Sequence, residues 1–100
     1  MNAKPIRVTD EADADLTNGA QWYAERSHTV AVAFVEEVYD CFSVIGQFPN
    51  GAPRVRGLIR QLPVSGFPFV VLYRPMPDHF IVLRIFHTSQ HPSKKFRLPK

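Results

Sequence analysis

Apolar residues recur along the first half of the chain at the spacing of an α-helix. Between residues 10 and 26, Leu16, Ala20 and Tyr23 fall three or four positions apart, which predicts one helix. A second helix is expected over residues 29–47. Six apolar residues there recur at three- and four-residue intervals on one face: Ala31, Phe34, Val35, Val38, Phe42 and Ile45. The short connection between the two segments predicts an antiparallel helical hairpin.

The second half of the chain changes to the pattern of β-strands. Three short runs of β-branched and aromatic residues predict strands at residues 58–64, 67–74 and 79–87. Another short strand is expected near the N-terminus, at residues 5–8. The last two runs are joined by residues 75–78, which predicts a hairpin. Their almost continuous apolar character is typical of strands in the centre of a sheet.

These elements predict a single α+β domain with the order β-α-α-β-β-β. A helical hairpin is expected to pack on one face of a mostly antiparallel sheet, which leaves the other face partly open. The length of 100 residues and the apolar content of 45% suit one domain with one core. Residues from about 88 to 100 are rich in bases and are expected to form a C-terminal tail.

Composition narrows the chemistry that the chain can perform. Cys41 is the single cysteine, which excludes an internal disulfide and a thiolate zinc site and fits a reducing cytoplasm. No window approaches the roughly 20 apolar residues that cross a bilayer, so no membrane association is expected. His87 and His91 are four residues apart but do not lie on a helix, and no glycine-rich phosphate loop occurs. We therefore expect neither a metal nor a cofactor.

Charge is distributed unevenly between the two halves. Residues 1–50 carry eight acids and three bases, whereas residues 51–100 carry nine bases and the single acid Asp78. The net charge of +3 hides this difference. The pattern predicts a positive surface on the sheet half of the molecule, suited to nucleic acid or to an acidic protein. A basic face that contacts only water and binds no partner would explain the same charge pattern.

Three arginines fall on the three expected C-terminal strands: Arg60, Arg74 and Arg84. Because neighbouring strands lie about 5 Å apart, arginines on one face would form a compact patch for phosphates or carboxylates. Strict alternation puts Arg84 and Val82 on one face of the last strand, and Ile85 with His87 on the other. An arginine inside an apolar strand is costly to bury, so Arg84 is the first functional candidate.

His87 ends the last expected strand, and two interpretations of it stay open. An imidazole has an unperturbed pKa near 6.5, which suits a general base or acid. A histidine at a strand end also serves as a structural residue that hydrogen-bonds the backbone. No neighbouring acid is visible to orient the ring, which favours the structural role. Tyr73, in the preceding strand, needs a polar partner for its hydroxyl if it is buried.

Four segments together resemble the ParE, or plasmid-stabilization, branch of the RelE/ParE toxin superfamily. They are DADLTNGAQWYAER, AVAFVEEVYDCFSVIGQFPNGAPR, IRQLPVSGFPFVVLYRP and IVLRIFH. Their order and spacing match over about residues 5–88. The resemblance implies the same order of elements and a cognate antitoxin whose extended segment wraps the helices and sheet. The expected antitoxin surface is the apolar groove beside the helical hairpin, with Trp22, Tyr23 and Phe34, which equally suit a core.

The resemblance implies two possible activities. ParE-like toxins are associated with inhibition of DNA gyrase, without catalysis by the toxin. RelE-like toxins are ribosome-dependent endoribonucleases that cleave messenger RNA. In this chain, RNA cleavage would need His87 as the base, with Arg60 and Arg84 holding the phosphate.

The sequence departs from the ribonuclease pattern. No acid occurs between Gly51 and Pro77, and Thr88 follows His87 where a His-Tyr pair would have tyrosine. The leading hypothesis is therefore a non-catalytic toxin that inhibits gyrase. Its expected target-binding residues are Arg60, Arg74, Arg84 and His87. An endoribonuclease is the alternative, and a relic that keeps the fold without toxicity is a third possibility.

Overall fold

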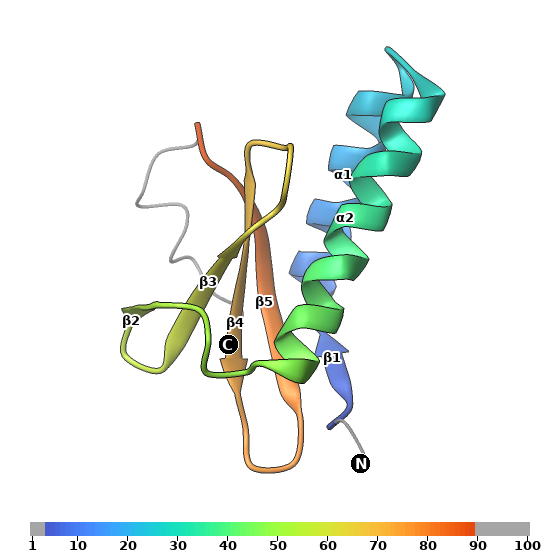
Figure 1. Ribbon diagram of the computed structural model, residues 1–100. Coiled ribbons are helices and arrows are strands. Elements are labelled where there is room, and N and C mark those ends of the chain that lie inside the picture. The colour runs from blue at the N-terminus through green and yellow to red at the C-terminus, as the bar shows by residue number, and fades with distance from the viewer. Residues whose placement is uncertain (1–3, 90–100) are drawn as a thin grey trace.

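The computed structural model describes residues 4–89 and contains two helices that cover one face of a five-stranded sheet (Figure 1). The helices are α1 (Asp10–Ala24) and α2 (His28–Gln47). The strands are β1 (Ile6–Val8), β2 (Arg54–Arg56), β3 (Ile59–Pro63), β4 (Phe69–Pro75) and β5 (Phe80–His87). The predicted α+β fold is confirmed, with one strand more than expected. Most of the predicted basic tail lies outside the described residues.

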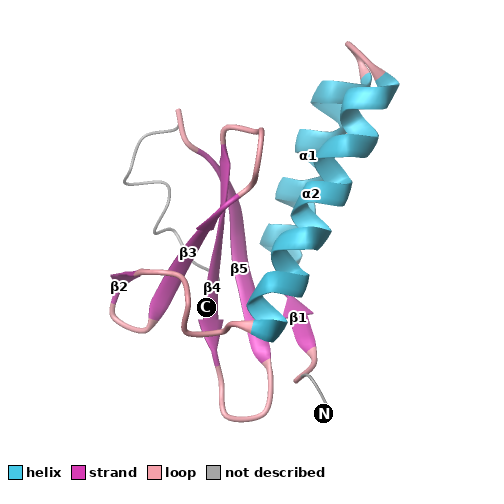
Figure 2. Cartoon of the chain, in the orientation of Figure 1, coloured by secondary structure: helices cyan, strands magenta, loops and turns pink. Residues whose placement is uncertain are grey.

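The strands lie in the order β1-β5-β4-β3-β2 (Figure 2). β1 runs parallel to β5, and every other neighbouring pair is antiparallel. β4 and β5 each have a neighbour on both sides, as their apolar sequences predicted. β2 was not predicted, because its three residues RVR are all exposed and carry no apolar alternation. Its pairing with β3 defines it as a strand.

Both helices begin at a hydroxyl side chain. The Thr9 Oγ1 atom accepts a hydrogen bond from the Ala12 N–H at 3.0 Å, and the Ser27 Oγ atom accepts one from the Val30 N–H at 3.3 Å. Each bond satisfies an amide that has no partner within its helix. The first turn of α1 also carries Asp10, Glu11 and Asp13, whose charges suit the positive end of a helix.

The core lies between the helices and the sheet. α2 buries six residues against it, which are Ala31, Phe34, Val38, Cys41, Phe42 and Ile45. Five of the six apolar positions predicted for this helix are among them, and Val35 packs at the margin of the core. At Gly19 of α1 a β-carbon would lie 2.9 Å from the Phe34 ring. Glycine at this position therefore lets α1 approach that ring closely.

Cys41 is expected to be nearly inert toward alkylating reagents in the folded protein. Burial, with nearby Glu37 and Asp40, raises the pKa of the Cys41 thiol from 9.0 to about 11. Two pKa units reduce the reactive thiolate about 100-fold below pH 9, because the thiolate is the nucleophile. Iodoacetamide at pH 8 should modify the folded chain at least about 100-fold more slowly than the urea-unfolded chain. Equal rates would contradict this placement of Cys41.

Strict alternation along β5, as predicted from sequence, is wrong at Leu83. The pairing with β4 runs from Leu72↔Arg84 directly to Tyr73↔Val82, which leaves one extra residue in β5. A β-bulge of this kind reverses the alternation beyond it. Val82 and Ile85 consequently both lie in the core beneath the helices.

The sheet face opposite the helices is less open than expected. Because Tyr73 belongs to the core under the helices, its neighbours Leu72 and Arg74 point to the opposite face. Leu72 is nevertheless fully buried, and Phe86 of β5 is 3% exposed, while Arg74 is exposed. Within residues 4–89, no helix is long and apolar enough to cross a membrane.

Candidate functional site

Arg84, the leading candidate from sequence, is bound to an aspartate of α1. The Asp15 carboxylate accepts hydrogen bonds from Arg84 Nε at 2.6 Å and from Arg84 Nη2 at 2.9 Å. The two side chains are 17% and 18% exposed. These bonds raise the pKa of the Arg84 guanidinium above its usual value, although burial acts against them. The Arg84 guanidinium thus links β5 to α1, and a target contact by Arg84 stays a prediction.

Asp15 also accepts a hydrogen bond from the backbone of β5, at a point beyond the last residue of β1. The Ile85 N–H donates to Asp15 Oδ2 at 3.0 Å, and Thr9 Oγ1 donates to the Leu83 carbonyl at 2.9 Å. Both groups lie on the outer edge of β5, beyond the last pair with β1 at Val8↔Val82. The first half of α1 thus takes the place that a longer β1 would occupy.

Arg60 is likewise used by the fold. Its Nη1 atom donates to the carbonyls of Ala52 at 2.6 Å and Asn50 at 3.2 Å, in the segment that follows α2. On the neighbouring strand, the Tyr73 hydroxyl donates to the Pro49 carbonyl at 2.9 Å, which is the polar partner predicted for it. Burial raises the pKa of Tyr73. Together the two side chains fix the return of the chain from α2 to the sheet.

The expected compact patch of three arginines does not form. Arg60 points toward the segment after α2, and Arg84 is bound at the opposite edge beside α1. Arg74 lies on the sheet face opposite the helices and is exposed. The bulge and the two sets of structural bonds separate the guanidinium groups. Within the described chain, no three metal-binding side chains gather either.

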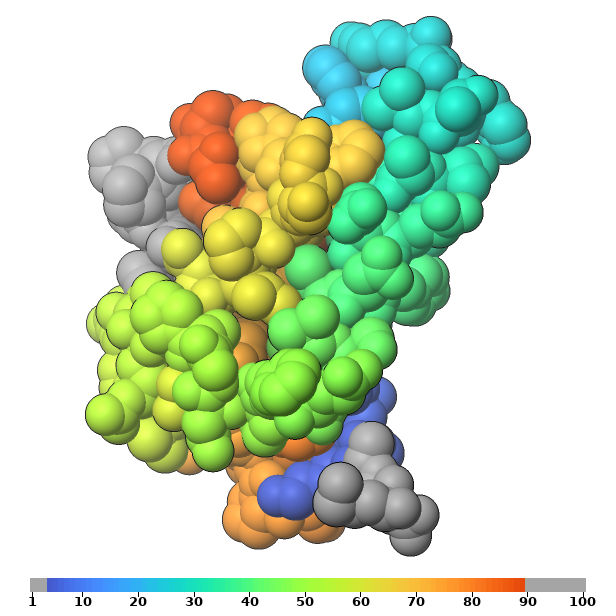
Figure 3. Space-filling model, viewed as in Figure 1, coloured from blue at the N-terminus to red at the C-terminus, as the bar shows by residue number. Residues whose placement is uncertain are grey.

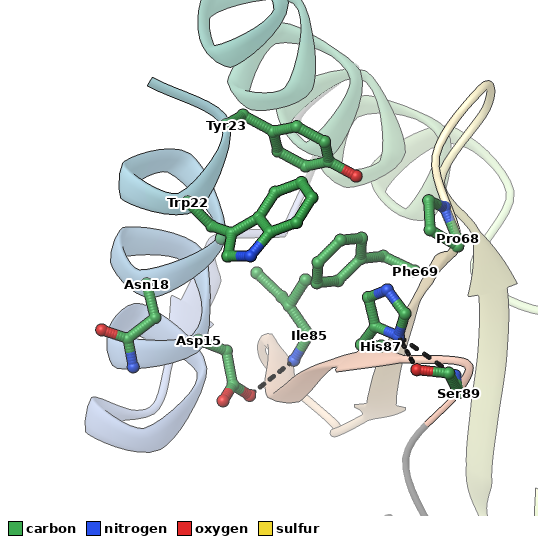
Figure 4. A pocket seen from close by; sticks show the side chains of 10 residues that line it. Asp15, Asn18, Trp22, Tyr23, Pro68, Phe69, Ile85, His87 and Ser89 are labelled. Carbon is green, nitrogen blue, oxygen red and sulfur yellow. Dashed lines mark hydrogen bonds between the residues drawn. The ribbon is translucent and has the colours of Figure 1, made fainter. Parts of the chain in front are cut away.

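His87 ends β5 with a defined hydrogen-bonding arrangement. Its Nδ1 atom accepts a hydrogen bond from the Ser89 N–H at 3.1 Å and lies 2.6 Å from Ser89 Oγ (Figure 4). Because the amide is a donor, the neutral ring carries its proton on Nε2. The ring stands edge-on to Phe69, with their centroids 4.9 Å apart. This geometry matches the structural role that the sequence favoured, and the partner is a serine rather than an acid.

A pocket opens between the second half of α1 and the end of β5, and we call it the Trp22 pocket (Figure 4). Its volume is about 530 Å³. Ten residues line it: Asp15, Asn18, Gly19, Trp22, Tyr23, Pro68, Phe69, Ile85, His87 and Ser89. The apolar members form most of the wall, and the histidine and the asparagine bring polar groups to it. Such a mixture suits an apolar side chain attached to a polar backbone.

Trp22 is the most prominent side chain of this pocket. It is 52% exposed, although tryptophan is rarely left in water without a partner. Its ring stands edge-on to Tyr23 at 5.1 Å, and the Arg26 guanidinium lies 3.5 Å from the ring centroid. Phe34, which the sequence placed with these two residues, is fully buried beneath the pocket. Of the two roles left open for Phe34, antitoxin contact and core, its burial supports the core role.

The pocket also borders a sheet edge that has no neighbour. The Thr88 N–H bonds to Pro68 on the β4 side, whereas the Ile85 N–H points outward to Asp15. Alternation then turns the Ile85 carbonyl and the His87 N–H outward as well. Neither group has a hydrogen-bond partner among residues 4–89. Open donors and acceptors at a strand edge form a template for an extended peptide.

The comparison with protein families decides the identity of this fold. A family model described as the ParE toxin of type II toxin-antitoxin system, parDE, matches residues 6–92. The chain belongs to the ParE toxin family. It is therefore a toxin-type component of a type II system, and membership of the ParE family implies an antitoxin partner.

A solved ParE-type structure has the same fold. It is described as the chromosomal ParDE TA system from P. aeruginosa, and its TM-score with this chain is 0.76 at 22% identity. The match covers 87% of this chain and 98% of that chain. At this identity the likeness establishes the architecture alone. A comparison with curated protein sequences gives no match.

Proposed function

We propose that this ParE family member inhibits DNA gyrase without catalysing a reaction, and that an antitoxin neutralises it at the Trp22 pocket. The observation that carries the non-catalytic part is the separation of Arg60, Arg84 and His87, the residues an RNA-cleaving site would need. Gyrase is proposed as the target because ParE-like toxins are associated with its inhibition. A ribonuclease must bring a base and a cationic clamp within reach of one phosphate. These three side chains point to different places and have other partners.

Each partner removes one requirement of RNA cleavage. Arg84 is neutralised by Asp15, and Arg60 is held by two backbone carbonyls. His87 has its Nδ1 atom engaged by Ser89, so the proton of the neutral ring lies on Nε2. In this tautomer Nε2 can donate a hydrogen bond but cannot act as a base, and Nδ1, the nitrogen that could accept a proton, is engaged by Ser89. The arrangement therefore favours binding over general-base catalysis.

Arg74 is our candidate for the contact with the target. It is exposed near the end of β4, on the face that the helices leave uncovered, and no carboxylate in the described part of the chain forms an ion pair with it. Of the four target-binding residues expected from sequence, the other three have partners within the described chain: Arg60, Arg84 and His87. His87 also lies on the opposite face from Arg74 and belongs to the Trp22 pocket.

The antitoxin part of the proposal is supported by the pocket and the open edge together. An extended segment that pairs with Ile85 and His87 would satisfy the two open backbone groups of β5. Alternate side chains of such a segment would enter the Trp22 pocket, where Gly19 leaves room beside Phe69. Strand addition of this kind combines backbone bonds for affinity with pockets for specificity.

Purified toxin is expected to abolish supercoiling by gyrase and to increase cleaved DNA in the gyrase complex, while translated messenger RNA stays intact. Arg74→Gln should raise the toxin concentration needed for half-inhibition about tenfold, since one charged contact contributes about 1.4 kcal/mol or more. Supercoiling gels and primer extension on translated RNA measure the two activities. Arg7→Gln, an exposed arginine on β1, is the matched control and should behave as the unmodified toxin.

His87→Ala and His79→Ala distinguish non-catalytic inhibition of gyrase from RNA cleavage. If the toxin cuts translated RNA, and His87→Ala stops the cuts while His79→Ala does not, the non-catalytic proposal fails. A folded toxin that affects neither gyrase nor RNA would also contradict the proposal and would indicate a relic. Circular dichroism of each variant checks that the fold is retained.

A further inference from the structure

The hairpin of β2 and β3 forms a corner of the sheet that neither the Trp22 pocket nor the proposed gyrase contact uses. All three residues of β2 are exposed, and the corner stands out from the body of the molecule (Figure 3, yellow-green). Its sequence RVRGLIR contains three arginines, Arg54, Arg56 and Arg60. At its tip Leu58 is 55% exposed. The corner therefore presents an apolar tip flanked by positive charges.

The turn at the tip is tight and holds Leu58 in a fixed position. Arg56 pairs with Ile59, so only Gly57 and Leu58 form the loop. Gly57 has a φ of +55°, and within the described chain no residue other than glycine has a positive φ. A positive φ at the first loop position alone is the pattern of a type II′ turn, which suits the twist of two paired strands. The hairpin is thus preorganised as a two-stranded ribbon.

The placement of the arginines costs stability. Arg54 lies directly opposite Arg60 in the strand pair, and like charges in this position repel each other. Arg60 is held by the Ala52 and Asn50 carbonyls, which do not neutralise its charge. No acid occurs from residue 51 to residue 77. Arg54 forms no ion pair with any carboxylate of residues 4–89. The charge of Arg54 is therefore not neutralised within the described chain.

We infer that this hairpin binds duplex DNA, with Arg54 and Arg56 on phosphates and Leu58 in a groove. The grooves of B-form DNA admit a two-stranded β-ribbon, and apolar tips pack against base edges or base steps. An A-form RNA helix has a major groove too deep and narrow for such a ribbon. An acidic protein is the competing partner for the same arginines, and poly-glutamate stands in for it in the test below. The inference does not depend on the identity of the toxin's target.

Fluorescence anisotropy with a labelled duplex of about 20 base pairs tests this inference directly. Binding of the full chain should weaken linearly with the logarithm of salt concentration, because each bound phosphate releases counterions. Arg54→Gln/Arg56→Gln should reduce the magnitude of the salt slope by about 2, because two phosphates are no longer neutralised. Leu58→Ser should weaken binding about tenfold and leave the slope unchanged, since it removes only apolar surface from the interface.

Lys4→Gln/Arg7→Gln is the matched control. It removes the same net charge from exposed positions at the other edge of the sheet, beside β1. The salt slope of this variant should equal that of the unmodified chain. An equal change in both double variants would overturn the inference, because it would indicate attraction by net charge alone. Failure of the unmodified chain to bind DNA at 50 mM salt, or equally tight binding of poly-glutamate or duplex RNA, would overturn it too.

The same variants distinguish this inference from the proposed function. If Arg54→Gln/Arg56→Gln binds DNA as the unmodified chain does while the toxin still inhibits gyrase, the hairpin inference fails alone. If the hairpin variants lose DNA binding as expected but the unmodified chain has no effect on gyrase, the proposed function fails and the DNA site stands.

Discussion

Asp15→Ala is expected to lower the free energy of unfolding by about 3 kcal/mol. The change removes one carboxylate from two partners, the Arg84 guanidinium and the Ile85 N–H, at a site where both charged side chains are less than one fifth exposed. Without Asp15, the partly buried Arg84 guanidinium still loses much of its hydration in the folded state but no longer gains the attraction of a carboxylate. Urea denaturation followed by circular dichroism measures the free energy of unfolding of both proteins. The slope of this free energy against urea concentration should be the same for the two.

Two further variants isolate the cause of this loss. Asp13→Ala removes an exposed aspartate from the same helix and should cost less than about 1 kcal/mol. Asp15→Asn keeps an acceptor for the Ile85 N–H but loses the charge, so its cost should lie between those of the two alanine variants. Adding Arg84→Met to Asp15→Ala should restore part of the stability, because no unpaired charge remains. Equal costs at positions 13 and 15 would contradict the structural role of the pair.

Trp22→Ala is expected to weaken antitoxin binding about 30-fold, or about 2 kcal/mol, if the Trp22 pocket is the antitoxin surface. A half-exposed tryptophan at the edge of a pocket has the size and the amphipathic ring of a typical hot-spot residue. Isothermal titration with the cognate antitoxin measures the affinity. The stability of the toxin alone should change little, because much of the ring is already in water.

Tyr39→Ala provides the control for this measurement. Tyr39 is an aromatic residue of α2 with similar exposure, 56%, but it does not line the pocket. Its replacement should leave antitoxin affinity unchanged within about twofold. If Tyr39→Ala weakens binding as much as Trp22→Ala, the antitoxin covers α2 more broadly and the assignment to the pocket fails.

The elements of the fold follow from local sequence patterns. The helical repeat from Ala31 to Ile45 and the strand runs after Gly57 specify the two classes of element and their order, because each pattern buries one face of its own element. The ends of the helices differ from expectation by one or two residues. β2 was missed because its pairing depends on β3 rather than on any apolar residue of its own. The bulge at Leu83 was missed for a similar reason, since register is a property of two strands.

The sequence by itself determined the fold class, the family resemblance and the absence of an acid in residues 51–77. These properties depend on the periodicity, order and identity of residues within short segments. Only the tertiary structure decided what the charged residues do. Arg84 and Asp15 are 69 positions apart, and no local pattern indicates that they meet. The packing of α1 along the end of β5 brings them together, and that ion pair turns the apparent functional arginine into part of the framework beside the Trp22 pocket.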